Sequence, residues 1–313
     1  MKSSRNIQKQ LEKTLASLAK MNGTVAAPTL GEVADKFLAI KLNKSSLREA
    51  TKKLTVYQHK RNLVAFRHIP IDQFTAAHWD ARIAEVEAMP ENERPFTRAF
   101  NFRKAVSEVL NYALVEGLID RKPKLDNPDE PRNVGRVVTE EEFERIQANV
   151  THDIFKLFFF TLRRMGCRPR EILKWEWDMI EWPAFEGDFA WINIPARISK
   201  TGRDRKIPIN SEVWAKLQDW RAQGPMPSKF VFPNRKDAGQ PQLSYHGAWR
   251  TACKKAGVAH CVPYDYRRTF ITYKMEKPDT PGVFVAKFLD TSMQQIEKTY
   301  AKAQKLTMEG IAG

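Results

Sequence analysis

Arg168 lies in a segment whose composition predicts a junction between two helices. In GCRPREI, Gly166 is suited to end one helix and Pro169 to occupy the first position of the next, so Arg168 falls in the turn. A guanidinium beside the free amides of a helix N-terminus suits a phosphate group, because the charge, the helix dipole and the donors point at one place. The alternative is a structural ion pair with a nearby carboxylate such as Glu171.

Arg267 repeats this arrangement further along the chain. In PYDYRRTF, Asp265 is expected to cap a helix, and Tyr264 and Arg267 are three residues apart, so they share a face of its first turn. A second guanidinium at a helix N-terminus again favours an anion site. Structural pairing of Arg267 remains open from this segment alone.

Lys200 is expected at the tip of a β-hairpin. The segment FAWINIPARISKTGRDRKIPI, residues 189–209, is typical of two strands joined by a turn that contains Thr201 and Gly202. An ammonium group at such a tip can reach an adjoining site and deliver a proton. Hairpin tips also carry lysines for solubility, so this segment leaves both roles open.

Tyr300 is expected on a C-terminal helix. Residues 288–292 are suited to cap this helix, and Met293, Ile296 and Tyr300 then fall on one face. The spacing alone favours a core aromatic whose hydroxyl lies near the surface.

The charge balance indicates a partner rich in phosphate. The 313 residues include 52 Lys and Arg against 37 Asp and Glu, which gives a net charge of +15 and a pI near 9.7. Such an excess is the electrostatic footprint of nucleic-acid binding. An acidic membrane surface would also attract the chain, but we find no lipidation signal and no apolar stretch of spanning length.

The sequence predicts two domains, of which the first is entirely helical. Residues 1–28 have helical spacing and are expected to form an N-terminal tail, and residues 29–120 form the helical domain. Its basic residues indicate a face for DNA phosphates or simply a solvated surface. They are Lys52, Lys53, Lys60, Arg61, Arg98 and Arg103.

The second predicted domain is mostly helical with one small antiparallel sheet. Residues 121–136 are polar and rich in proline, and we interpret them as a linker to the domain of residues 137–313. Strands are expected near 177–181, 189–198 and 205–209, and Thr139 begins a helix with a capping box. The fold class is therefore mainly α, with a mixed α/β second domain.

The cysteines favour a reducing compartment. Cys167, Cys253 and Cys261 are odd in number and lack the spacing of a zinc site or a disulfide framework. The first residues also lack the pattern of a secretory signal. We therefore expect a cytoplasmic protein.

The order and spacing of these segments resemble those of the tyrosine recombinase (phage integrase) family. GCRPREI is similar to the family's first arginine box, ISKTGRDRKIPI to its lysine hairpin and YDYRRTF to its HxxR box. LDTSMQQIEKTYAK resembles the closing segment, in which Tyr300 follows Leu289 by eleven residues as in the family pattern. FRHIPIDQFTA, at 66–76, is similar to the helical (SAM-like) core-binding domain. The resemblance covers about residues 29–303.

The resemblance implies a role for each matched residue. Arg168 and Arg267 would hold the non-bridging oxygens of the scissile phosphate, and Tyr300 would attack the phosphorus and form a 3′-phosphotyrosine. Lys200 would protonate the departing 5′ oxygen. The ester conserves the bond energy, so rejoining needs no cofactor and no metal is implied.

Two positions depart from the family pattern. The family usually has His where Tyr264 stands, and His or Trp where Thr291 stands. Tyr264 still donates hydrogen bonds but is a poorer proton acceptor than imidazole near neutral pH, and Thr291 keeps one short donor. We expect these replacements to slow or retune cleavage rather than abolish it.

The resemblance also implies partners. They are double-stranded DNA, a homotetramer on two recombination sites and accessory DNA-bending proteins, in a nucleoid-associated bacterial or phage setting such as a mobile genetic element. Two other functions stay open: a DNA-binding regulator built on a weakened recombinase, which the two replacements favour, and a type IB-like topoisomerase.

Overall fold

The computed structural model describes residues 26–43, 49–90, 99–126, 135–224, 227–258 and 261–300. The chain divides into two compact units, residues 1–132 and 133–313. The boundary falls inside the segment 121–136 that the sequence analysis assigned to a linker. Most of the predicted N-terminal tail lies outside the described residues. Among the described residues, no helix is long and apolar enough to cross a membrane.

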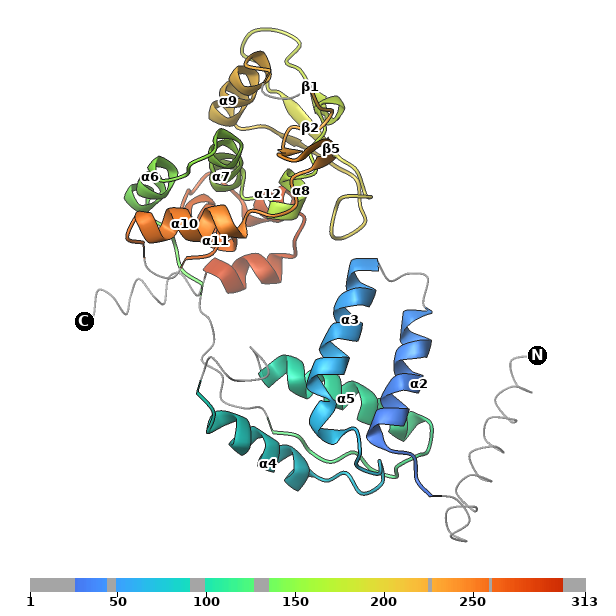
Figure 1. The fold of residues 1–313 in the computed structure, drawn as a ribbon. Coiled ribbons are helices and arrows are strands. Elements are labelled where there is room, and N and C mark those ends of the chain that lie inside the picture. The colour runs from blue at the N-terminus through green and yellow to red at the C-terminus, as the bar shows by residue number, and fades with distance from the viewer. Residues whose placement is uncertain are drawn as a thin grey trace, which may run out of the picture. The chain divides into compact units, whose positions relative to one another are not determined.

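Among the described residues of the first unit, the regular elements are all helical (Figure 1). Its elements are α2 (Leu30–Leu42), α3 (Glu49–Asn62), the 3-10 turn η1 (Val64–Phe66), α4 (Ala76–Glu87) and α5 (Ala99–Val115). A capping box between Thr29 and Glu32 begins α2. The buried side chains of α5 recur at helical spacing, at Phe102, Val106, Val109, Leu110 and Ala113, because this helix packs against α2 and α3.

The second unit combines helices with two small sheets. Its first elements are α6 (Glu140–Ala148), α7 (Asp153–Met165), α8 (Pro169–Ile172), η3 (Trp177–Met179), β1 (Ile180–Glu181), β2 (Trp191–Ile194) and β3 (Arg205–Pro208). They are followed by α9 (Ser211–Ala222), β4 (Pro233–Asn234), β5 (Asp237–Pro241), α10 (His246–Lys255), α11 (Pro263–Met275) and α12 (Gly282–Leu289). Residues 293–300 are also helical.

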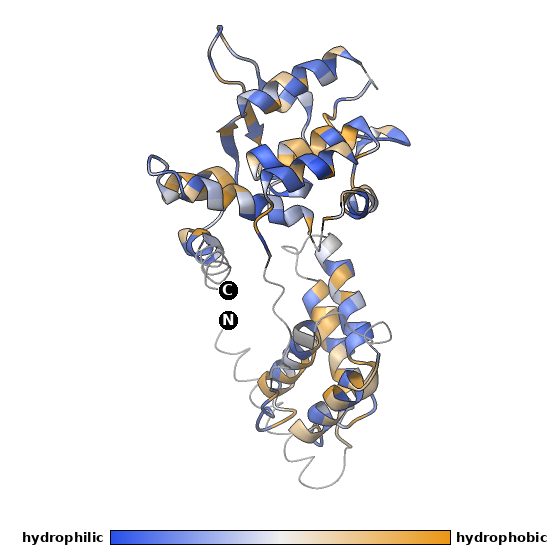
Figure 2. Ribbon diagram, turned by 90° about the vertical axis from the view of Figure 1, so that its left-hand side faces the viewer, coloured by the Kyte–Doolittle hydropathy of each residue, from blue (hydrophilic) through white to orange (hydrophobic). Residues whose placement is uncertain are grey.

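The helix α7 forms the centre of the second unit's core. It contacts α6, α8, α9 and α11, and nearly all of its side chains are buried (Figure 1). Figure 2 shows apolar and polar residues alternating along the helices of both units, as amphipathic helices require. The mainly helical fold class with a small antiparallel sheet is therefore confirmed.

The strands β1, β2 and β3 form an antiparallel sheet in sequence order. The predicted hairpin is confirmed, since Trp191 pairs with Pro208 and Ile194 with Arg205. The strand predicted from residue 177 was wrong at its start: residues 177–179 form a 3-10 turn in which the Met179 amide donates to the Glu176 carbonyl at 3.1 Å. This turn leaves β1 only two residues long.

Candidate functional site

The turn that carries Arg168 has the structure that its sequence predicts. Gly166 ends α7 in the left-handed conformation, with φ of 62°, and Pro169 is the first residue of α8. A Cβ atom at Gly166 would lie 2.5 Å from Cγ of Phe270, so both the backbone and the packing require glycine. Arg168 is the N-cap residue of α8.

Arg267 lies in the second turn of α11 and is buried, with 2% of its surface exposed. Asp265 does cap this helix, but not from the N-cap position that was expected: the N-cap residue is Val262 and the helix begins at Pro263. Asp265 is the third residue of the helix, and its carboxylate accepts a hydrogen bond from the Val262 amide at 2.8 Å. Proline at the first helical position moved the start three residues earlier than expected.

Three arginines donate hydrogen bonds to three successive carbonyl oxygens at the C-terminal end of α12. Arg205 Nη1 lies 3.2 Å from the Phe288 oxygen, Arg267 Nη2 lies 2.9 Å from the Leu289 oxygen, and Arg168 Nη2 lies 2.6 Å from the Asp290 oxygen. The last carbonyls of a helix lack intrahelical partners and carry the negative end of its dipole. This helix end therefore gathers three guanidinium groups from distant parts of the sequence.

Arg267 is also bound to the turn that holds Arg168. Its Nη1 donates to the Gly166 carbonyl at 3.0 Å. Burial lowers the pKa of Arg267 from its ordinary value, which reflects the cost of desolvating a cation. The two arginines are thus linked through the Gly166 turn and through the end of α12.

Two carboxylates offset part of the positive charge of these three guanidinium groups. Glu171, which is 2% exposed, accepts from Arg168 Nη1 at 2.9 Å and from Arg205 Nη2 at 2.6 Å. The structural pairing of Arg168 with Glu171 that the sequence left open is therefore present. Asp290 provides the second carboxylate, 3.2 Å from Arg168 Nη1. Burial lowers the pKa of Arg168, but the two carboxylates outweigh it and raise that pKa above the ordinary value.

The tip of the β2–β3 hairpin is attached to the same cluster. The Lys200 amide lies 3.4 Å from Oε1 of Glu171, and the flanking hydroxyls of Ser199 and Thr201 donate to Oδ2 of Asp290 at 3.2 Å and 2.6 Å. The Lys200 residue itself is exposed. The structure therefore brings the backbone of Lys200 to Arg168 and leaves its side chain accessible.

The positions of Tyr264 and Thr291 differ from those of the arginines. Tyr264 is 45% exposed, and the Arg268 guanidinium lies 5.7 Å from the centre of its ring. Arg267 is buried, so the two side chains differ in exposure, although Tyr264 is close enough to influence the pKa of Arg267. Thr291 is partly buried, and its amide donates to the Ala286 carbonyl at 3.0 Å.

Tyr300 is partly buried on the helix of residues 293–300. Ser292 caps this helix as predicted, since its hydroxyl accepts from the Gln295 amide at 3.2 Å. Ile296 is fully buried and packs with Leu289 and Phe270 in a small apolar cluster. No hydrogen bond within the described part of the chain joins Tyr300 to Arg168 or Arg267, and Ile296 packs its helix against Leu289 at the end of α12.

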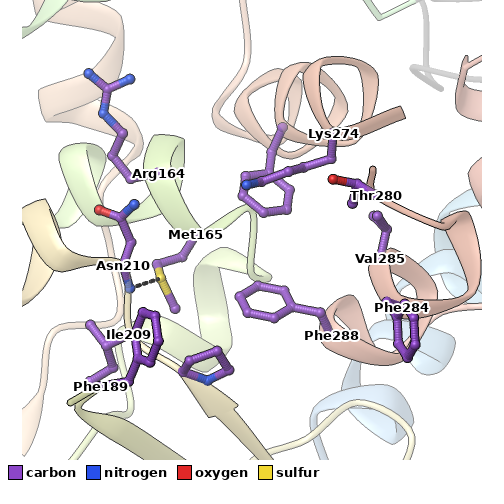
Figure 3. Close-up of a pocket in the computed structure, with 12 residues that line it drawn as sticks. Arg164, Met165, Phe189, Ile209, Asn210, Lys274, Thr280, Phe284, Val285 and Phe288 are labelled. Atoms are coloured by element: carbon purple, nitrogen blue, oxygen red, sulfur yellow. Dashed lines mark hydrogen bonds between the residues drawn. The ribbon is translucent and has the colours of Figure 1, made fainter. Parts of the chain in front are cut away.

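An apolar pocket of about 260 Å³ lies on the same unit but is a separate feature (Figure 3). Phe284 and Phe288 line one side, and Phe189 and Ile209 line the other. None of the six predicted site residues lines it, so the pocket does not hold the chemistry of the arginine cluster.

Sequence reasoning missed Arg205 and Asp290 as parts of the cluster. Arg205 is paired with Ile194 in the β2–β3 hairpin, and its inward direction depends on the register of the strands. Asp290 is the one non-glycine residue with positive φ among the residues that the structure describes. No spacing or capping signal in the sequence marks Asp290 as part of the site.

Comparison with known proteins places this chain in a family. The model of the phage integrase family matches residues 136–306, more than half of the chain. The chain belongs to the phage integrase family. Its relatives include the tyrosine recombinases XerA of Pyrococcus horikoshii and Pyrococcus furiosus, each 26% identical over 55% of this chain. The chain spans 59% of the length of each of these relatives.

Integrase-family structures share the fold over both units. A lambda integrase dimer bound to a COC′ core site superposes with a TM-score of 0.70 at 15% identity, covering 91% of this chain and 80% of that one. The XerH recombinase bound to difH gives 0.64 at 13% identity, covering 92% of this chain and 100% of the other. At such identities the superposition shows the fold alone.

Proposed function

We propose that this integrase-family chain is a site-specific DNA recombinase that cuts and rejoins DNA through a phosphotyrosine at Tyr300. The observation that carries the proposal is the convergence of Arg168 and Arg267 on Leu289 and Asp290, beside the hairpin tip that holds Lys200. Two guanidinium groups and an ammonium group from three segments suit one phosphodiester.

The proposed cleavage exchanges one phosphate ester for another. The phenol oxygen of Tyr300 attacks the phosphorus, the bond to the 5′ oxygen breaks, and the DNA 3′ end remains on the enzyme. The phenol proton passes to a base or to solvent, and Lys200 gives a proton to the departing 5′ oxygen. Arg168 and Arg267 stabilise the negative charge that develops on the non-bridging oxygens.

Tyr264 and Thr291 take supporting roles in this proposal. Tyr264 is the second residue of α11, where its phenol can donate a hydrogen bond to a phosphate oxygen. Thr291 follows Asp290 directly and supplies one hydroxyl. Neither residue replaces an imidazole as a proton acceptor near neutral pH, so the proposed rate is lower than that of a site with histidine.

The proposed assembly is a homotetramer on two duplex sites, aided by DNA-bending proteins. The net charge of +15 supplies affinity for phosphates that does not depend on sequence. Arg103 is one of the basic residues for which the sequence left open a phosphate-binding face or a solvated surface, and its Nε donates to the Leu125 carbonyl at 2.7 Å, which is a structural contact within the first unit.

A DNA-binding regulator is the second candidate function. It is favoured by the replacement of the family's usual histidine by Tyr264 and by the carboxylate of Asp290 beside Arg168. The two functions differ in whether a covalent complex forms with DNA.

Covalent trapping tests the proposal. The full chain is incubated with fragmented DNA from its source, and complexes that survive denaturant are isolated and their DNA is sequenced. We expect one recurrent sequence, with Tyr300→Phe giving no complex while it still binds that sequence. Binding to a specific sequence without any covalent complex would instead identify a regulator, and covalent complexes at unrelated sequences a topoisomerase.

A further inference from the structure

Asp290 adopts a backbone conformation that most residues avoid. Its φ is 52°, directly after the last residue of α12. Glycine adopts this left-handed region freely, and aspartate and asparagine visit it more readily than other residues do. The fold therefore accepts backbone strain at a position where glycine would carry none, which indicates that the side chain of Asp290 has a role of its own.

The carboxylate of Asp290 occupies the anion-binding position of the arginine cluster. Its Oδ2 atom lies 3.2 Å from Nη1 of Arg168 and accepts hydrogen bonds from the hydroxyls of Thr201 at 2.6 Å and Ser199 at 3.2 Å. Only 14% of this side chain is exposed. A phosphate oxygen that bound Arg168 from this side would meet the same three donors.

Asp290 also halves the excess positive charge of the cluster. Arg168, Arg205 and Arg267 contribute three positive charges, and Glu171 and Asp290 remove two of them. The remaining charge is +1, and it would be +2 without Asp290. A phosphodiester carries one negative charge and gains a second in the pentavalent transition state, so Asp290 opposes its binding in both states.

The carboxylate is ionised near neutral pH. Burial raises the pKa of Asp290, but the hydrogen bond from Thr201 and the charge of Arg168 outweigh burial and hold that pKa below its ordinary value. Protonation at neutral pH therefore cannot remove the carboxylate from the site, and a competing anion has to displace it.

We propose that Asp290 is an autoinhibitory gate: its carboxylate holds the place of the scissile phosphate on Arg168, and entry of the phosphate displaces it. The same displacement releases Ser199 and Thr201, which flank Lys200. Binding of the phosphate and freedom of the hairpin tip are thereby coupled through one side chain. The coupling to the hairpin tip rests on the proposed function, because that function gives Lys200 a role in cleavage.

Binding of inorganic phosphate to the full chain tests the gate without any catalysis. Asp290→Asn keeps the shape of the side chain and its tolerance for positive φ but removes the charge. We expect it to bind phosphate about tenfold more tightly by titration calorimetry, which corresponds to ~1.4 kcal/mol. Asp219→Asn, at an exposed position of α9, changes the net charge equally and should bind like the wild type. Equal affinity in all three proteins would overturn the proposal.

Cleavage of the trapped DNA sequence tests the coupling. In single turnovers at subsaturating DNA, Asp290→Asn should form the covalent complex about tenfold faster than the wild type and Asp219→Asn. An unchanged or slower rate would show that Asp290 is a brace for the hairpin rather than a gate. Asp290→Gly provides a second variant that also relieves the strain at φ 52°, should the asparagine variant unfold. If no protein forms a covalent complex, the proposed function fails, while phosphate binding still decides the gate.

Discussion

Arg168 and Arg267 donate hydrogen bonds to the carbonyl oxygens of adjacent residues, Asp290 and Leu289, at 2.6 Å and 2.9 Å. Arg168, at the N-cap of α8, and Arg267, in the second turn of α11, are thus both held by the end of a third helix, α12. The arrangement explains how a mostly helical unit fixes two cations beside each other without an excessive desolvation cost, because the helix dipole and two carboxylates offset their charge.

Replacement of Arg267 should damage both the fold and the activity. Arg267→Ala leaves the buried carbonyls of Gly166 and Leu289 without their donor, and each unsatisfied group costs ~1–3 kcal/mol. Arg267→Lys retains a charge but cannot span both carbonyls. We expect the free energy of unfolding to fall by roughly 3 kcal/mol in the alanine variant and by less in the lysine variant, with no covalent complex in either. Urea unfolding measures whether the alanine variant is less stable than the lysine variant. A lysine variant that cleaves DNA like the wild type would contradict the role of the Arg267 guanidinium group.

Glu171 should contribute far more to stability than an exposed carboxylate with similar partners. Glu171→Gln removes the charge that Arg168 and Arg205 share at a position only 2% exposed, and breaking a buried pair costs ~3–5 kcal/mol. Glu181→Gln, which breaks the half-exposed pair with Lys206, should change stability by less than ~1 kcal/mol. Thermal unfolding of the two variants measures the difference, and equal shifts would refute it.

Gly166→Ala should be more damaging than the same change at Gly257. Both glycines have nearly the same φ, 62° and 63°, so the backbone penalty of ~1–2 kcal/mol is common to them. The added Cβ meets Phe270 at 2.5 Å in the first case and nothing within 4 Å in the second. We expect Gly166→Ala to lose at least ~1 kcal/mol more than Gly257→Ala in urea unfolding. It should also weaken cleavage, since the Gly166 carbonyl holds Arg267.

The first unit should lose stability in acid through Glu108. Burial raises the pKa of this carboxyl, but hydrogen bonds from His59 at 3.0 Å and Lys41 at 2.8 Å outweigh it and lower that pKa to about 2. A carboxyl with a depressed pKa stabilises the folded state above its ordinary pKa of 4.5 and loses that contribution as the pH falls towards 2.

Hydrogen exchange of α5 measures this contribution. Amides of α5 should exchange faster in Glu108→Gln than in the wild type at pH 6. The difference should shrink progressively below pH 4.5. A difference that stays constant down to pH 3 would show that Glu108 acts through shape rather than charge.

Local signals in the sequence predicted the elements that carry the site. Gly166 and Pro169 placed the turn at Arg168, and the capping pair Thr139 and Glu142 placed the start of α6, because such residues act on their own neighbours. Asp265 was assigned to the wrong cap position because proline and aspartate both favour the start of a helix and proline prevailed.

The hydrogen-bond partners of the arginines could not be predicted from the sequence. Hydrogen bonds from Arg205 to Phe288 and from Arg168 to Asp290 join segments that meet only in the tertiary fold. The role of Asp290 depended on a positive φ, which no spacing rule reveals for a residue other than glycine. The difference in exposure between Tyr264 and Arg267 likewise follows from the packing of α11 against α7, not from their helical spacing.

Mass spectrometry of the covalent complex shows directly whether Tyr300 is the residue that becomes attached to DNA. The full chain is trapped on its DNA sequence, treated with nuclease and digested with trypsin. We expect a nucleotide attached through a 3′ phosphate to the peptide of residues 299–302, which contains Tyr300, and its absence in Arg168→Ala and Arg267→Ala proteins that remain folded. A nucleotide on Tyr264 or Tyr273, or an adduct that persists without both arginines, would contradict it.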